Sequence, residues 1–239
     1  MTDRTTSPGG RPRAVVSWSS GKDSAYALHE VRRAGELEVV GLLTTVTETF
    51  GRVSMHGVRE SVLEAQARAA GLPLHKVSIP SPCPNAVYER AMGAALERLR
   101  ADGVRRVVFG DLFLEDIRAY REEKLRGTGV DPVFPLWGRP TAALAEEMIT
   151  SGLRARIVAL DPRHLPPSFA GRTFDRELLA SFPAGVDPCG ERGEFHTCVT
   201  DGPMFDRPIP VVPGEIVQRD GFVFADFEVG ELTRGSPGR

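Results

Sequence analysis

The first half of the chain alternates short apolar runs with segments of helical periodicity, and this alternation is the feature that most constrains the fold. The apolar runs, which predict buried strands, lie at residues 14–18, 37–46, 74–79 and 105–110. Helical patterns fill the intervals at residues 23–34, 58–70 and 88–100, and Gly35 and Gly71 end the first two. Strands joined by single helices require right-handed crossovers, so we expect an α/β domain with a parallel sheet and helices on both faces.

The pattern changes after about residue 126. It predicts a helix at 141–150, a strand at 156–160, a short helix at 174–181 and a hairpin at 217–227, where Asp220-Gly221 favours a tight turn. We therefore expect a first domain over residues 13–126 and a smaller C-terminal α+β domain over residues 127–232. A disordered arm (1–12) and a flexible tail (233–239) are expected to flank them.

Composition excludes several classes of protein. Hydrophobic residues make up 41% of the chain, and no apolar run approaches the roughly 18 residues that cross a bilayer. The N-terminus lacks the apolar core of a secretory signal, and Cys83, Cys189 and Cys198 form no paired motif. A net charge of -2 gives no basic excess for gripping a duplex. We expect a cytoplasmic protein without a membrane span, a structural zinc site or a duplex nucleic-acid partner.

The segment Ser19–Ser24, with the sequence SSGKDS, joins the first predicted strand to the first predicted helix. Gly21 lets the backbone approach an anion, the helix start supplies unpaired N–H groups, and Lys22 adds a positive charge. Ligands bind beyond the carboxyl ends of strands in such sheets, so the loop is a candidate phosphate site. The Walker A pattern fails at Val16 and Asp23, where it needs Gly and Ser or Thr. The structural alternative is a Gly-Ser turn that only caps the helix.

The loop resembles the PP-loop, S-G-G-x-D-S, of the ATP pyrophosphatases, which have a Rossmann-like fold of the PP-loop or HUP type. Ser20 stands where that pattern has its first Gly, a change that restricts the backbone without closing the loop. The resemblance implies that Lys22 and Asp23 take part in catalysis. The residues that it implies for ATP binding are Ser19, Ser20, Gly21, Lys22, Asp23 and Ser24.

The second half carries a longer motif at residues 185–205, GVDPCGERGEFHTCVTDGPMF. It resembles the signature of the diphthine-ammonia ligase family, G-x-D-x-x-G-E-x-G-E-[FY]-x-T followed by D-x-P. Shorter elements of the family are resembled by Met55-His56, Gly110-Asp111 and Pro135-Leu136-Trp137, which occur in the family's order. The resemblance covers about residues 13–230. The signature positions matched are Gly185, Asp187, Gly190, Glu191, Gly193, Glu194, Phe195, Thr197, Asp201 and Pro203.

Glu191 and Glu194 are paired carboxylates in a Gly-rich loop. From the residues alone, such a pair can hold a cationic substrate or an amine, bind Mg²⁺ or act as a base, or it can be a solvated turn. The resemblance implies that both glutamates are catalytic. The substrate-binding residues that it implies are Asp187, Gly190, Glu191, Gly193, Glu194 and Thr197.

Two further residues follow predicted strands at the expected ligand edge. His56 can contact the nucleotide or transfer a proton, or it can be an ordinary loop histidine. Asp111, in the element Gly110-Asp111, can bind Mg²⁺ or a ribose, or it can cap a helix. We expect His56, Gly110 and Asp111 in the ATP site and Asp111 as a Mg²⁺ ligand. A thiol nucleophile at Cys189, beside His196, lacks an orienting third group and is not expected.

The resemblance implies an ATP-dependent amide ligase with ATP and Mg²⁺ as cofactors. The loop holds the β- and γ-phosphates, a carboxylate attacks the α-phosphorus, pyrophosphate leaves, and ammonia then displaces AMP. In the family proper the acceptor is diphthine on elongation factor 2. The expected partners are therefore ATP, ammonia and a carboxylate substrate on a small molecule or a protein side chain. A homodimer is a possible assembly.

Alternatives remain for the identity of the acceptor and for the reaction. Of the 30 basic residues all but Lys22, Lys76 and Lys124 are arginines, a bias typical of GC-rich bacterial genomes. We therefore expect a bacterial-type member, and bacteria are not expected to make diphthamide. Another PP-loop reaction, such as adenylation of a tRNA base or sulfur transfer, lacks support from paired cysteines or a basic patch. A non-catalytic ATP-sensing module explains the loop but not the paired glutamates.

Overall fold

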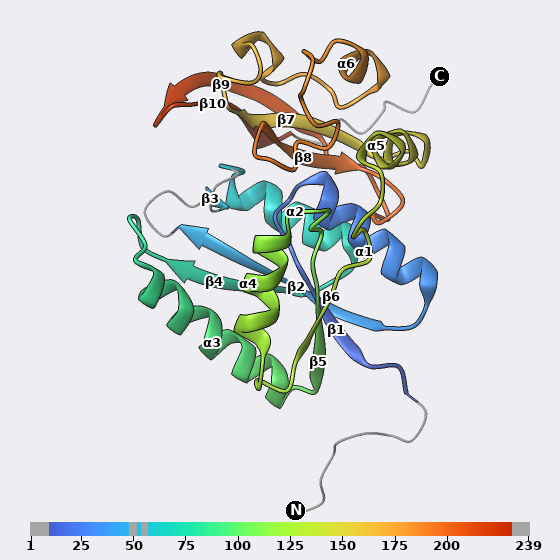
Figure 1. Cartoon of the computed structure of the whole chain (residues 1–239), viewed down its shortest axis with the longest axis vertical. Coiled ribbons are helices and arrows are strands. Elements are labelled where there is room, and N and C mark those ends of the chain that lie inside the picture. The colour runs from blue at the N-terminus through green and yellow to red at the C-terminus, as the bar shows by residue number, and fades with distance from the viewer. Residues whose placement is uncertain (1–9, 48–51, 54–56, 231–239) are drawn as a thin grey trace, which may run out of the picture.

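Two sheets organise the part of the chain that the computed structural model describes, residues 10–47, 52–53 and 57–230 (Figure 1). The larger sheet has the order β3-β2-β1-β5-β6, with β4 paired to β2. Its pairings are parallel except that between β2 and β3. The strands are β1 (Arg13–Ser17), β2 (Glu38–Thr47), β3 (Arg52–Val53), β4 (Leu74–Ile79), β5 (Val104–Val108) and β6 (Asp131–Val133).

Helices cover both faces of the larger sheet, which confirms the predicted α/β class. They are α1 (Lys22–Ala34), α2 (Glu60–Ala70), α3 (Asn85–Ala101) and α4 (Glu115–Leu125). Gly35 and Gly71 end α1 and α2 in the left-handed conformation, at φ 69° and 65°, as glycine stops do. α1 and α2 lie on the face toward the second sheet, and α3 and α4 lie on the opposite face (Figure 1).

The second sheet is antiparallel, with the order β8-β7-β10-β9. β9 and β10 form the predicted hairpin, with Asp220 and Gly221 at positive φ in its turn. This sheet and its helices confirm the smaller α+β unit. The elements are α5 (Thr141–Thr150), β7 (Arg154–Leu160), η1 (Pro167–Phe169), α6 (Arg176–Ala180), β8 (Phe195–Asp201), β9 (Val211–Arg219) and β10 (Phe222–Val229).

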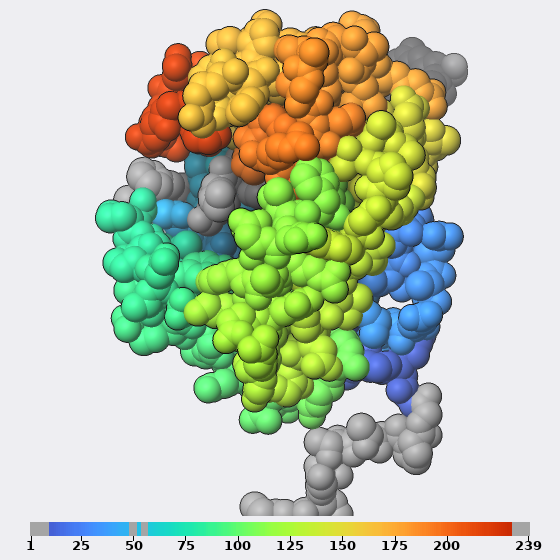
Figure 2. Space-filling model, viewed as in Figure 1, coloured from blue at the N-terminus to red at the C-terminus, as the bar shows by residue number. Residues whose placement is uncertain are grey.

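One hydrophobic core joins the two sheets through α1 and α2. It includes Val16 of β1, Leu28 of α1 and Phe195 of β8, whereas Val15 packs into a second core beneath α3 and α4. β1 is therefore buried on both faces, as a central parallel strand should be. Figure 2 shows the C-terminal surface, yellow to red, resting directly on the N-terminal surface. Loops at the carboxyl end of β1 consequently meet the second sheet.

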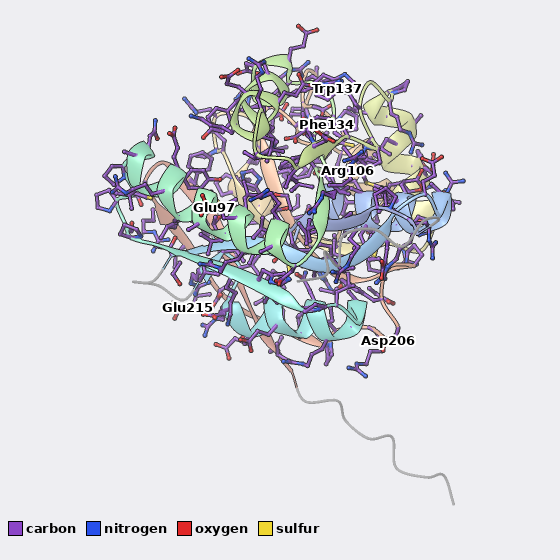
Figure 3. All side chains as sticks on the ribbon, turned by 90° about the horizontal axis from the view of Figure 1, so that it is seen from below. Glu97, Arg106, Phe134, Trp137, Asp206 and Glu215 are labelled. Atoms are coloured by element: carbon purple, nitrogen blue, oxygen red, sulfur yellow. The ribbon has the colours of Figure 1, made fainter. Side chains whose placement is uncertain are left out.

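Three strands were not predicted. β3 and β6 are too short for a periodicity to be recognised, and β8 lies inside the Gly-rich signature. β6 carries the larger sheet past residue 126, where the sequence pattern changes. Just after it, Phe134 and Trp137 lie side by side (Figure 3), with ring centroids 6.0 Å apart. Among the described residues, no helix combines the length and the apolar character that crossing a membrane requires.

Candidate active site

The PP-loop runs from the end of β1 to the start of α1, and its backbone turns sharply at Ser20. This residue has φ 70°, a left-handed conformation at the position where the PP-loop pattern has glycine. The Ser20 carbonyl accepts hydrogen bonds from the backbone N–H of Val199 (2.9 Å) and from Nε2 of Gln66 (3.1 Å). The strained residue is thus held by two donors from other elements.

Serine hydroxyls line this turn. The hydroxyls of Ser19 and Ser24 lie 3.1 Å apart, and Ser24 donates to the carbonyl of Gly21 at 3.0 Å. The hydroxyl of Ser20 is fully buried and makes no hydrogen bond within the described part of the chain. An unpartnered buried hydroxyl is costly. A phosphate oxygen is an acceptor of the kind that would satisfy it.

The C-terminal signature is built onto the PP-loop through β8. The hydroxyl of Thr197 accepts a hydrogen bond from the backbone N–H of Lys22 at 3.0 Å. Together with the bond from Val199 to Ser20, this contact places the start of α1 against β8. The two motifs found far apart in the sequence are therefore in direct contact. Thr197, expected to bind substrate, satisfies the first N–H of the helix.

Lys22 points into this junction. Its ammonium contacts both carboxylate oxygens of Asp23, at 2.9 and 2.8 Å, and donates to the carbonyl of Cys189. The rings of Phe174 and Phe195 lie 5.7 and 5.4 Å away, and only 2% of the lysine side chain is exposed. Burial is the largest single influence and acts to lower the pKa of Lys22, but the acidic groups around it, Asp23 first and then Cys189 and Glu191, together raise the pKa above its ordinary value, so the ammonium stays charged. The Lys22 ammonium thus contacts Asp23 and Cys189, and its expected role toward a phosphate stays a prediction.

Asp187 and Glu194 shape the signature loop by accepting bonds from its backbone. One oxygen of Glu194 accepts from the N–H of Asp187 and the other from that of Arg192, both at 3.0 Å. Asp187 in turn accepts from the N–H groups of Cys189 (3.2 Å) and Glu191 (3.0 Å). Both acidic side chains are buried. Their carboxylates are engaged within the loop, so they determine where Glu191 lies.

The signature glycines are required by backbone geometry. Gly190 and Gly193 have φ of 68° and 86°, which favours residues without a side chain. At Gly190 a Cβ atom would also lie 2.8 Å from the carbonyl oxygen of Phe195. These two predicted substrate-binding residues thus serve the turn of the loop.

Glu191 reaches across from the signature to the end of β5. Its carboxylate accepts the backbone N–H of Leu112 at 2.7 Å. Burial raises the pKa of Glu191 to about 7, with smaller contributions from Asp23 and Asp111, while the bond from Leu112 opposes the shift. A carboxylate that titrates near neutral pH suits acid–base chemistry.

This shift predicts a pH-dependent stability. The pKa of Glu191 rises from 4.5 to about 7 on folding, so the folded state holds the proton more tightly. The stabilisation is complete below pH 4.5 and is lost as the pH rises through about 7, at about 1.4 kcal/mol per pKa unit. Between pH 5 and 8, the free energy of unfolding measured in urea should fall by about 2 kcal/mol more for the wild type than for Glu191→Gln. Parallel stability curves for the two proteins would contradict the prediction.

Gly110 and Asp111 follow β5 at the same edge. A Cβ at Gly110 would lie 2.7 Å from the backbone carbon of Asp23, so only glycine lets this segment contact the first turn of α1. The carboxylate of Asp111 binds Arg121 at 2.7 and 3.3 Å. The expected ATP ligand His56 and its neighbour Met55 lie outside the described residues. Gly110 therefore packs against the start of α1, Asp111 pairs with Arg121, and the place of both residues in an ATP site stays a prediction.

Cys189 is buried and its thiol donates to the carbonyl of Thr141 at 3.4 Å. Burial raises the pKa of Cys189 to about 12. The thiolate is therefore scarce at neutral pH, which agrees with the expectation that this thiol is not a nucleophile.

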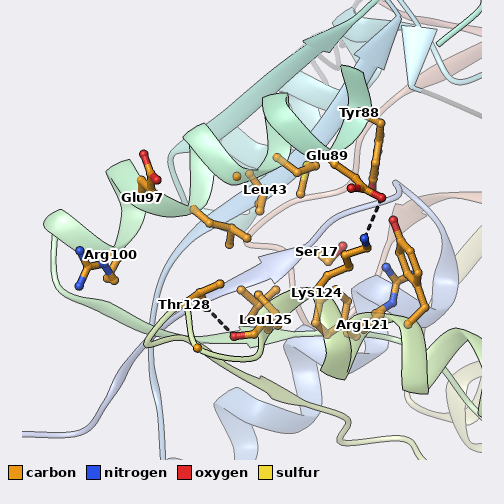
Figure 4. Close-up of a pocket in the computed structure, with 17 residues that line it drawn as sticks. Ser17, Leu43, Tyr88, Glu89, Glu97, Arg100, Arg121, Lys124, Leu125 and Thr128 are labelled. Carbon is orange, nitrogen blue, oxygen red and sulfur yellow. Dashed lines mark hydrogen bonds and ion pairs between the residues drawn. The ribbon is translucent and has the colours of Figure 1, made fainter. Parts of the chain in front are cut away.

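A separate groove of about 420 Å³ lies between α3 and α4, on the face of the sheet opposite α1 (Figure 4). Its floor includes Ser17, Leu43 and Phe109, and an ion pair of 2.7 Å between Lys124 and Glu89 spans it. None of the PP-loop residues, all of which the structure describes, lines this groove. It is not part of the junction between the two motifs.

Gln66 is a residue of the site that the sequence motifs did not indicate. It lies on α2, is fully buried, and bonds to Trp18, Ser20 and Val199. The signal was present in the helical pattern, because an amide stands among the apolar positions Leu63, Ala67 and Ala70. A polar residue on the buried side of a helix needs partners.

Comparisons with known proteins show which family the chain resembles. A family model described as the diphthamide synthase N-terminal domain matches residues 12–132, and one described as the diphthamide synthase C-terminal domain matches residues 140–229. Proteins named diphthine–ammonia ligase from Bos taurus and Homo sapiens are each 28% identical, over 89% of this chain and 88% of the relative. One from Danio rerio is 28% identical over 89% of this chain and 91% of the relative. The chain therefore belongs to the diphthamide synthase family of PP-loop ligases.

Proposed function

We propose that this protein adenylates a carboxylate with ATP, releases pyrophosphate and then forms an amide with ammonia. The observation that carries the proposal is the direct contact between Lys22 of the PP-loop and Thr197 of the signature. A nucleotide held at the loop would lie beside the signature carboxylates. Activation and amide formation could then share one site.

The phosphates are assigned to the turn between β1 and α1. Ser19 and Asp23 are its partly exposed residues, and the start of α1 contributes the positive end of the helix dipole. The unpartnered hydroxyl of Ser20 supports the presence of an anion there. Lys22 is assigned a positioning role, because its ammonium holds the signature loop through Cys189.

The first step joins the acceptor to AMP. An oxygen of the acceptor carboxylate attacks the α-phosphorus, the bond from that phosphorus to the β-phosphate oxygen breaks, and pyrophosphate leaves with the electron pair. In the second step the nitrogen of ammonia attacks the acyl carbon, the bond to AMP breaks, and the nitrogen loses a proton. Glu191 is the proposed base, since its pKa of about 7 lets it take up that proton at neutral pH.

Mg²⁺ fits this site only as a partner of the nucleotide. Within residues 10–47, 52–53 and 57–230, no group of three His, Cys, Asp or Glu side chains could hold a metal ion. Mg²⁺ commonly binds through one or two carboxylates and substrate phosphates, and when bound it neutralises phosphate charge. Asp111 is the proposed ligand, which requires that it leave Arg121.

The names of the relatives suggest a candidate for the acceptor carboxylate. Those relatives are named for diphthine, so a protein bearing diphthine is the first carboxylate to try, and other carboxylates form the comparison set. The protonation and burial of Glu191 do not distinguish among them. The chemistry at the α-phosphorus is the same for each.

Product analysis tests the proposal. With α-labelled ATP, ammonia and an accepted carboxylate, we expect AMP, pyrophosphate and amide in equal amounts, and no AMP when the carboxylate is omitted. Formation of ADP and phosphate would contradict adenylation. Tight ATP binding without turnover, across the set of carboxylates, would favour a non-catalytic ATP-binding module.

A further inference from the structure

A buried amide connects the PP-loop to both neighbouring elements. The side chain of Gln66 on α2 is fully inaccessible to solvent. Its oxygen accepts the indole N–H of Trp18 at 2.9 Å, and its nitrogen donates to the carbonyls of Ser20 at 3.1 Å and Val199 at 2.8 Å. Only this orientation of the amide fits, because the reverse would set its oxygen against two carbonyls. Both amide hydrogens are therefore used.

The partner that matters is Ser20. A non-glycine residue at φ 70° is unfavourable by about 1 kcal/mol relative to extended or helical backbone, and it persists only when its surroundings hold it. The Ser20 carbonyl is held from two sides, by Gln66 and by the N–H of Val199. Releasing that carbonyl would let Ser20 return to negative φ and would turn the following N–H groups away from their present direction.

We propose that Gln66 is a positioning residue of the PP-loop, whose carboxamide keeps Ser20 in the left-handed conformation that aims the loop at the phosphates of ATP. This inference rests on the proposed use of ATP. It explains how a chain with serine in place of the first PP-loop glycine keeps a glycine-like turn. It also explains a buried glutamine on a helix face that is otherwise apolar.

The substitution Gln66→Met keeps the length of the side chain and removes its donors. We expect the KM for ATP to rise and kcat/KM for ATP to fall roughly 10- to 100-fold, since one hydrogen bond to a buried group is lost and the loop relaxes. The KM for the acceptor should stay unchanged. A purely structural role would lower the fraction of active enzyme and leave both KM values as they are.

Glycine at position 20 provides the decisive test. Glycine adopts positive φ without a penalty, so in a Ser20→Gly background the turn should no longer depend on Gln66. Ser20→Gly also removes a hydroxyl of the proposed phosphate site, so the Ser20→Gly enzyme is the reference, and adding Gln66→Met to it should change kcat/KM for ATP less than about threefold. An equal loss on adding Gln66→Met to the wild type and to Ser20→Gly would overturn the proposal. Gln218→Met, on the exposed strand β9, is the matched control and should behave as the wild type.

A second variant covers the case in which Gln66→Met does not fold. Trp18→Phe keeps an aromatic ring in the core but removes the N–H that orients Gln66. It should lower kcat/KM for ATP by roughly 3- to 10-fold in the wild type and have no such effect when added to Ser20→Gly. A Trp18→Phe enzyme with wild-type kinetics, or an equal loss in the Ser20→Gly background, would count against the proposal.

Failure of this inference can be told from failure of the proposed function. ATP binding by titration calorimetry and AMP release are measured first on the wild type. If the wild type neither binds nor cleaves ATP, the proposed function fails. If the wild type binds and cleaves ATP, and Gln66→Met has the same dissociation constant for ATP and the same rate of AMP release, only the role proposed for Gln66 is wrong.

Discussion

Replacing Lys22 with methionine should lower the free energy of unfolding by about 3 kcal/mol and the Tm by roughly 10 °C. The substitution leaves the Asp23 carboxylate, which is 28% exposed, without its cation, and leaves the carbonyl of Cys189 without its donor. Removing one partner of a buried pair is costly because the other charge remains poorly solvated. Chemical unfolding followed by circular dichroism measures the effect.

Two controls separate this effect from a general loss of charge. Lys124→Met removes the cation of an exposed pair with Glu89 and should cost no more than about 0.5 kcal/mol. The double variant Lys22→Met/Asp23→Asn should recover part of the loss, because it leaves no unpaired carboxylate. If Lys22→Met instead unfolds like the wild type and only weakens ATP binding, the ammonium acts on a phosphate, as the sequence alone suggests.

The fold could be predicted where the local pattern of apolar residues reflects which faces of a strand or helix are buried. Alternating apolar runs and helical segments gave the central strands and their helices, because β1 is buried on both faces and the helices pack one face against the sheet. Thr141–Thr150 is a helix with the bounds that its periodicity predicts. β8 could not be predicted in this way, since its burial depends on contact with α1 rather than on alternation.

The candidate site was predictable as a set of motifs but not as a set of contacts. The PP-loop and the signature were recognised from spacing, and the structure brings them together at Lys22 and Thr197. The direction of the Lys22 side chain depends on Cys189, which is far along the chain. The use of Glu194 within its own loop depends on how that loop folds. Such contacts come from tertiary packing, which residue types at a given spacing do not specify.

Gly110→Ala should be as damaging as the loss of Lys22, although it adds a single methyl group. The new Cβ would lie 2.7 Å from the backbone carbon of Asp23 and 2.8 Å from the nitrogen of Ser24, and no flexible side chain is there to move aside. Gly110 does not have positive φ, so the effect is due to this contact alone. We expect a loss of about 3 kcal/mol in unfolding free energy, as in severe overpacking.

Because the clash falls on the first turn of α1, Gly110→Ala should also weaken ATP binding in the fraction that stays folded. Gly93→Ala makes the same chemical change on α3, where nothing lies within 4 Å of the new Cβ. It should stabilise the protein by about 0.5 to 1 kcal/mol, since alanine favours a helix over glycine. Thermal melts and ATP titrations of the two variants form one experiment. Equal behaviour of the pair would mean that the segment after β5 can move away from α1, and that its contact with the PP-loop does not fix the position of the phosphates.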